Sequence, residues 1–274
     1  MRDPSRPSAS ELRSRVAHLT FRKPGYQGPG EQQLDAQGEV VHGDTKEAWL
    51  MTNNGVMLTP EAEPDAADPF AGATLHLPPL EGHLAVVTQY TASTMALNAA
   101  LNELLFDALQ LAGVDRERLG NRPFVVLKQM RYAGEPSDVA AGRLGAGAHA
   151  DWGAFTILAT DGTPGLELQM GDSWLAVPPR EGAFIINSGD QINQLTNGVY
   201  RSAVHRVVTV STKPRYSTAL FTYFNLAALV GPLPCFISPV TPAAFPTDRT
   251  TLAYFHHKLR ESMDRGGSYA EARA

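Results

Sequence analysis

The 274-residue sequence has a single cysteine, no long apolar run and no excess of positive charge. Cys235 alone cannot form an internal disulfide bond and suits a reducing compartment, so we expect a cytoplasmic protein. No stretch approaches the roughly 18 consecutive apolar residues of a membrane span, so we expect no membrane partner. The formal net charge of −5 argues against nucleic acid, which requires a basic surface. We therefore expect a monomer whose partner is a small-molecule substrate.

Residues 1–72 show little periodic apolar pattern and are rich in Gly, Pro, Gln and Glu. The stretches FRKPGYQGPGEQQLDAQGEV and EAEPDAADPFAG indicate loops or extended chain. The extreme N-terminus, MRDPSRPSASELRSR, contains acidic residues and no apolar core of a signal peptide, so we expect a disordered tail. The sequence thus predicts a loop-rich N-terminal segment.

The rest of the chain divides into a helical support (73–123), a β core (124–230) and a C-terminal segment with a helix (231–274). Apolar residues at helical spacing predict a long helix within about 83–112, with Leu97, Leu101, Leu104, Leu105, Ala108 and Leu111 on one face. Turn signals such as PPREG and LTNG separate short apolar runs in the β core, which predicts an antiparallel sandwich or barrel. The predicted strands are 124–132, 155–160, 166–170, 183–187, 203–210 and 217–224, and a last helix is predicted over 249–263.

A histidine and an aspartate two positions apart occur twice, as His42-Gly-Asp44 and His149-Ala-Asp151. The spacing alone means little, because such pairs arise readily by chance. We do not expect the first pair to bind metal, since it lies in a Gly-rich segment where no strand is predicted. The second pair opens a predicted strand, and His205 lies on a later one. Two histidines and one carboxylate form the facial triad of non-haem Fe(II) sites, which leaves metal positions open.

Arg215 and Ser217 lie two positions apart on the last predicted strand, so their side chains point to the same face. If that face is buried, the guanidinium needs an anion, because an unpaired buried charge is costly. An arginine and a hydroxyl together can hold a carboxylate. The two residues therefore indicate a seat for a carboxylate ligand.

Three segments in order, GAHADWGAFTIL, PGLELQMGDSWLAVPPREGAFIINSGDQINQLTNGVYRSAVHRVV and RYSTALF, resemble the Fe(II)- and 2-oxoglutarate-dependent dioxygenase superfamily. The branch that contains isopenicillin N synthase is the most similar. The resemblance runs from about residue 124 to 226 and includes the Trp-x-x-Val-Pro-Pro, Asn-x-Gly-Asp and Thr-Asn-Gly turns. It implies a mainly β fold with flanking helices around a double-stranded β-helix, the jelly-roll core of cupin-like proteins. Family members usually carry a longer N-terminal region, so we expect residues 1–72 to be a shortened form of it.

The resemblance also implies a cofactor and a co-substrate. By this resemblance His149, Asp151 and His205 ligate Fe(II), and O2 takes an open position on the metal. The distal carboxylate of 2-oxoglutarate binds Arg215 and Ser217. The family's Asn-x-Tyr segment corresponds to Met130-Arg131-Tyr132, so Tyr132 is retained as a co-substrate contact while the Asn is lost. No catalytic residue beyond the iron ligands is implied.

The expected function is an oxygenase that couples oxidative decarboxylation of 2-oxoglutarate to oxidation of a small organic metabolite. Hydroxylation is the default outcome, with desaturation or cyclisation as variants. Trp152 and Phe221 occupy positions that often line the family's substrate pocket, although simple core packing explains them equally well. Alternatives are an iron oxidase of the same fold that does not use 2-oxoglutarate, a catalytically inactive binding module and, more remotely, a cupin-type isomerase.

Overall fold

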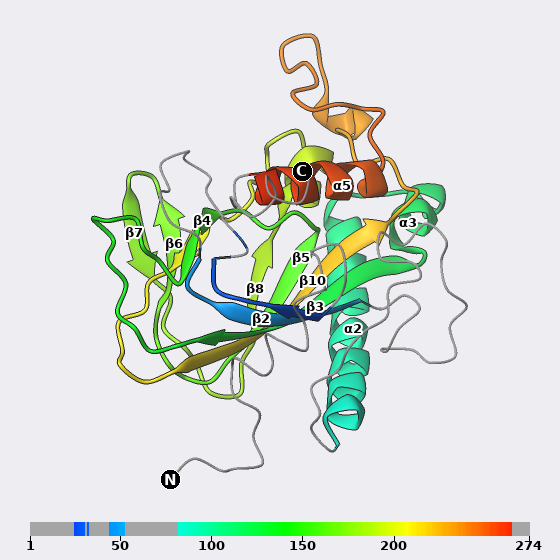
Figure 1. The fold of residues 1–274 in the computed structure, drawn as a ribbon. Coiled ribbons are helices and arrows are strands. Elements are labelled where there is room, and N and C mark those ends of the chain that lie inside the picture. Colours follow the sequence, from blue (N-terminus) through cyan, green and yellow to red (C-terminus); the bar gives the residue numbers. More distant parts are fainter. Residues whose placement is uncertain (1–24, 31, 33–43, 53–81, 265–274) are drawn as a thin grey trace, which may run out of the picture.

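The computed structural model describes residues 25–30, 32, 44–52 and 82–264, which form two antiparallel sheets and the helices around them (Figure 1). The larger sheet has six strands in the order β1-β2-β3-β10-β5-β8. Its strands are β1 Gly25–Gln27, β2 Glu47–Thr52, β3 Pro123–Tyr132, β5 Phe155–Thr160, β8 Ile185–Ser188 and β10 Arg215–Asn225.

The smaller sheet has four strands in the order β4-β9-β6-β7. They are β4 Ala146–His149, β6 Leu166–Met170, β7 Ser173–Ala176 and β9 His205–Val207. Side chains from both sheets meet in one buried cluster, in which Met130 and Ala219 of the large sheet join Leu166 and Val207 of the small one. The sheets therefore pack face to face, as in a jelly roll.

Alternation along β3 and β10 divides their side chains between two environments. Val125, Leu127 and Leu220 point outward into an apolar cluster with Val87 of the long helix α2, His83–Ala108. The residues that alternate with these three along β3 and β10 point inward, into the space between the sheets, because successive side chains of a strand project to opposite faces. The cavity described below is lined from this inner face.

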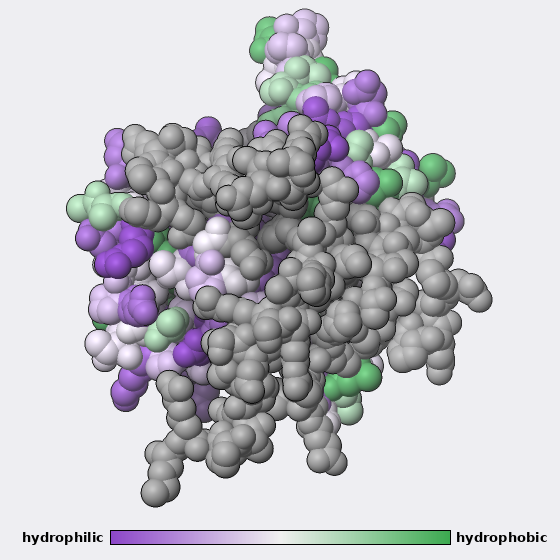
Figure 2. Space-filling view, in the orientation of Figure 1, coloured by the Kyte–Doolittle hydropathy of each residue, from purple (hydrophilic) through white to green (hydrophobic). Residues whose placement is uncertain are grey.

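Short helices close the ends of the sandwich. Helix α3, Gly113–Gly120, and helix α4, Asp190–Leu195, share an apolar cluster with the end of α2. Helix α5, Thr251–Asp264, buries Phe255 against Phe124 and Tyr223, and a 3₁₀ turn, Pro234–Phe236, lies before it. Within the described part of the chain, no helix is long and apolar enough to cross a membrane. On the face shown in Figure 2, hydrophilic residues gather over the edge that carries β6 and β7.

The predicted elements of the β core are confirmed at β3, β5, β6, β8, β9 and β10, with shifted ends at β8 and β9. The sequence prediction missed β1 and β2, which lie in the segment assigned to loops. Both strands are short, and they gain their stability from pairing, β2 along β3 and β1 along β2. It also missed β4, β7, α3 and α4. The expected tail and most of residues 1–72 lie outside the described residues.

The apolar face predicted for the long helix is only partly buried. Leu105 is buried, whereas Leu104 is 67% exposed. Leu97 and Leu101 pack against the core, and the buried positions of the helix also include the polar Thr91, Asn98 and Asn102. Small polar side chains fit close to the sheet, and the leucine periodicity alone could not show this.

Candidate metal centre and its cavity

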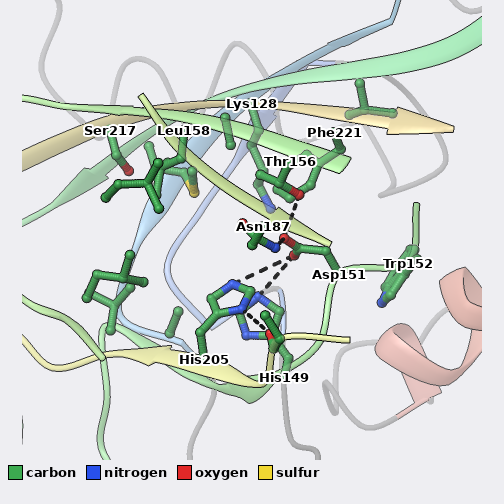
Figure 3. Close-up of a pocket in the computed structure, with 18 of the residues that line it drawn as sticks. Lys128, His149, Asp151, Trp152, Thr156, Leu158, Asn187, His205, Ser217 and Phe221 are labelled. Carbon is green, nitrogen blue, oxygen red and sulfur yellow. Dashed lines mark hydrogen bonds and ion pairs between the residues drawn. The ribbon is translucent and has the colours of Figure 1, made fainter. Parts of the chain in front are cut away.

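His149, Asp151 and His205 converge on the cavity between the sheets (Figure 3). His149 ends β4 and pairs directly with His205 at the start of β9. Asp151 lies between β4 and β5, so the prediction that the His149 and Asp151 pair opens a strand is wrong. Its Oδ1 is 3.6 Å from His149 Nε2 and 3.8 Å from His205 Nε2. One ligand atom from each residue lies within 4.8 Å of the other two, close enough for all three to bind one metal ion.

Both histidine rings are oriented by the backbone. His149 Nδ1 lies 2.8 Å from the carbonyl of Gly147, and His205 Nδ1 lies 2.8 Å from the carbonyl of Ala203. A carbonyl oxygen can only accept, so each Nδ1 carries a proton, and in the neutral ring the lone pair lies on Nε2. This arrangement is typical of metal-binding histidines, whose second nitrogen donates to a backbone or carboxylate oxygen.

Asp151 is buried and held by two neutral donors. Thr156 Oγ1 and Asn187 Nδ2 donate to its Oδ2 at 2.6 and 2.8 Å. Oδ1 is left facing the two imidazoles. Burial raises the pKa of the carboxyl group, but His205, His149 and the two hydrogen bonds lower it more, and the pKa lies below its ordinary value. The carboxyl group therefore remains an anionic ligand at neutral pH.

Burial and the neighbouring His205 lower the pKa of His149 to about 3. The ring is consequently neutral at physiological pH, which is the form that binds a metal ion. Two imidazoles and one carboxylate on one side of a cavity fit Fe(II) and leave its other positions accessible.

The predicted carboxylate seat lies deeper in the same cavity. Arg215 is almost completely buried, and its Nη1 lies 3.4 Å from Ser217 Oγ. Its Nε donates to the carbonyl of Thr163 at 3.2 Å. Tyr132 is also buried, and the guanidinium carbon of Arg215 stands 4.9 Å from the centre of its ring. The structure therefore brings together the three residues predicted to hold the co-substrate.

A cavity of about 410 Å³ connects this seat with the three metal-ligand candidates. Both expected substrate-pocket residues, Trp152 and Phe221, line it, and Trp152 also packs edge-on against Phe255 of α5. Most other lining residues are apolar. The cavity is also lined by polar residues that were not predicted from the sequence: Thr156, Asn187, Lys128, Lys46, Gln27, Gln32 and Ser188.

Asp44, the aspartate of the rejected His-x-Asp pair, has a structural role. It is buried, forms an ion pair with Lys46, and accepts a hydrogen bond from the backbone N–H of Gly147 at 2.9 Å. Since Gly147 also accepts from His149, Asp44 helps to fix the strand that carries this imidazole. His42 lies outside the described residues.

The 2OG-Fe(II) oxygenase superfamily model matches residues 123–223, which span β3 to β10. Among individual relatives, 2-oxoglutarate-dependent dioxygenase citB of Monascus ruber is 40% identical over 117 residues, which cover 41% of this chain and 36% of that protein. Kihadalactone A synthase LFS of Citrus sinensis is 31% identical over 237 residues, or 82% of this chain and 68% of that protein. This chain belongs to the 2OG-Fe(II) oxygenase superfamily.

The fold of this oxygenase family member agrees with that assignment. A 2OG-Fe(II) oxygenase family protein from Caulobacter crescentus superimposes with a TM-score of 0.73 at 25% identity, over 94% of this chain and 81% of that one. The two antiparallel sheets are thus the double-stranded β-helix expected from the sequence. The match to citB covers only about a third of that relative's length.

Proposed function

We propose that this protein is an iron-dependent oxygenase that couples decarboxylation of 2-oxoglutarate to oxidation of a small organic metabolite. The observation that carries the proposal is the continuity of one cavity, which has the His149, Asp151 and His205 cluster on one wall and the buried Arg215 farther in. Bound Fe(II) and 2-oxoglutarate would together activate O2 for attack on a substrate C–H bond.

The role of the chain's own residues is to bind and orient the metal ion and the co-substrate. In this proposal His149, Asp151 and His205 hold the metal, and Thr156 and Asn187 fix the carboxylate so that Oδ1 faces the imidazoles. Arg215 and Ser217 hold the distal carboxylate of 2-oxoglutarate, with Tyr132 as a further contact. The electrostatic reason for a bound anion is that no carboxylate of the described residues lies within ion-pair distance of the buried Arg215 guanidinium.

The rest of the cavity excludes water and receives the metabolite. Trp152 and Phe221 supply apolar walls beside the metal-ligand cluster, which protects a reactive site from side reactions. The names of the relatives include the synthase described above and codeine O-demethylase of Papaver somniferum, and a small organic substrate is consistent with both names. We further propose that the protein acts as a monomer in the cytoplasm, in keeping with its single cysteine and moderate negative charge.

The test is succinate release from 2-oxoglutarate in the presence of Fe(II), O2 and a panel of metabolites, with the products analysed by mass spectrometry. We expect succinate to rise with one class of metabolite, whose product gains an oxygen atom or loses two hydrogen atoms. Oxygen uptake that does not depend on 2-oxoglutarate would instead identify an oxidase of the same fold. If the protein did not bind Fe(II), both enzyme functions would be excluded, and a catalytically inactive binding module would be the remaining alternative.

A further inference from the structure

Lys128 is a buried cation that the proposed reaction does not use. It lies in the middle of β3, is 5% exposed and lines the cavity (Figure 3). Its Nζ donates to the neutral side chain of Gln32 at 2.6 Å. Within residues 25–30, 32, 44–52 and 82–264, no carboxylate lies within ion-pair distance of this ammonium group. A charge in such a place costs stability unless a ligand compensates it.

The nearby acidic group is already neutralised. Asp44 uses one carboxylate oxygen for Lys46 and the other for the backbone of Gly147. Burial and the positive charge of Lys46 lower the pKa of Lys128 to about 7, in spite of the attraction of Asp44 and Asp151. The ammonium form thus lacks an adequate counter-ion.

Bound cofactors leave this charge uncompensated. The charges of Fe(II), the 2-oxoglutarate dianion, Asp151 and Arg215 cancel one another. Among the described residues that line the cavity, Lys128 is then the cation without a counter-charge. Its neighbours on the inner face of the large sheet are apolar: Leu50 and Ala219 are its cross-strand partners, and Val126 and Met130 flank it along β3.

We propose that Lys128 binds a carboxylate of the substrate, and that the substrate is a mainly apolar organic acid. This inference rests on the proposed oxygenase function. Lys128 lies on the large sheet, across the cavity from β4 and β9, which carry the two histidines. An acid anchored on Lys128 would extend its apolar part along Trp152 and Phe221. Lys128 is accordingly a substrate-positioning residue that selects for a negative charge.

The experiment measures binding of two probe acids, 2-naphthoate and 4-phenylbutyrate, against their primary amides. Anaerobic calorimetry on the protein loaded with Fe(II) and 2-oxoglutarate avoids turnover. We expect the acids to bind at least about tenfold more tightly than the amides, because a charge-assisted hydrogen bond is lost in the amide. Lys128→Met should reduce this preference to near unity, and Lys128→Arg should retain part of it. Lys213→Met, a change at an exposed lysine, is the matched control and should keep the full preference.

A second measurement separates substrate binding from a structural role. If the ammonium group lacks a counter-ion, Lys128→Met without probe should have a Tm equal to or a few degrees above that of the wild type. A clear fall in Tm would assign Lys128 to fold stability and overturn the proposal. Equal affinity of acids and amides in the wild type, lack of binding by both acids, or an unchanged preference in Lys128→Met would also overturn it. The visible absorption of the iron complex with 2-oxoglutarate reports on the underlying function: its absence would overturn the oxygenase proposal, whereas its presence would confine a failure to Lys128.

Discussion

His149 and His205 face each other across the pairing of β4 and β9, with ring centroids 4.3 Å apart. Strand pairing therefore sets the separation of the two imidazoles. The backbone carbonyls of Gly147 and Ala203 fix both ring orientations, so that each Nε2 points toward Asp151. The cluster is thus organised by the sheet and by main-chain atoms.

Asn187 should tune metal affinity, because its amide donates to Oδ2 of Asp151. We expect Asn187→Ala to weaken Fe(II) binding about tenfold, the usual effect of removing a hydrogen bond to a metal ligand. Anaerobic Fe(II) titration provides the dissociation constant. Asn121→Ala, at an exposed position after α3, is the control. Equal dissociation constants for the Asn187 variant and the wild type would contradict this role.

Arg215 should determine the affinity for 2-oxoglutarate. Arg215→Met removes a charge-assisted contact, and we expect the dissociation constant to rise about 10- to 100-fold. Ser217→Ala should have a smaller effect, because it removes a neutral donor. Calorimetry with the metal-loaded protein measures both variants, with the exposed Arg180→Met as control. A wild-type affinity in Arg215→Met would place the carboxylate elsewhere.

The stability contributed by Lys128 should depend on pH. The pKa of this ammonium group is about 7 in the fold, against an ordinary value of 10.5. Between these two pH values the unfolded chain binds more protons at this position, so the free energy of unfolding rises with pH. Asp44, Lys46 and Asp151 are the charges that influence the group.

Urea unfolding of the wild type and Lys128→Met at pH about 6.5 and about 9.5 tests this sign. We expect the variant's advantage in the free energy of unfolding to be larger at the lower pH and to shrink at the higher one. Lys213→Met should show no such pH-dependent difference from the wild type. If the stability advantage of Lys128→Met over the wild type instead grew with pH, the Lys128 ammonium group could not be unfavourably buried.

Gly153 should be intolerant of a side chain, because an added Cβ would lie 2.1 Å from the carbonyl oxygen of Thr222. Gly153→Ala therefore has to displace the segment that follows Asp151, at a cost of about 1–3 kcal/mol in the free energy of unfolding. Gly113→Ala provides the control, since a Cβ there meets nothing within 4 Å. Urea unfolding distinguishes them, and equal stability of the two variants would disprove the clash.

The sequence predicted those site residues whose common orientation follows from the alternation of side chains along one strand. Arg215, Ser217 and Phe221 share one face of β10, and all three line the cavity as alternation requires. Thr156 and Asn187, which donate to Asp151, were not predicted. They lie on different strands, and the pairing of β5 with β8 is what brings both side chains to the Asp151 carboxylate. Their contribution arises from tertiary structure.

Two other features are marked in the sequence itself. Lys128 interrupts the apolar run FVVLKQM in the middle of a strand, a position where a charge is exceptional. Asp44 lies two residues before Lys46, and its structural role depends on the ion pair with Lys46 and the hydrogen bond from Gly147. Strand β4, with sequence AGAH, has too little apolar side chain to be recognised without its partner β9.

The central claim is that His149, Asp151 and His205 form one Fe(II) site. Anaerobic titration of the metal-free protein with Fe(II), followed by 2-oxoglutarate, tests it most directly. We predict that the wild type binds one Fe(II) per chain and then develops the visible absorption of the 2-oxoglutarate complex. His149→Ala should lose most of this binding, while His257→Ala, on the exposed side of α5, should keep it. No Fe(II) binding by the wild type, or undiminished binding by His149→Ala, would contradict the account.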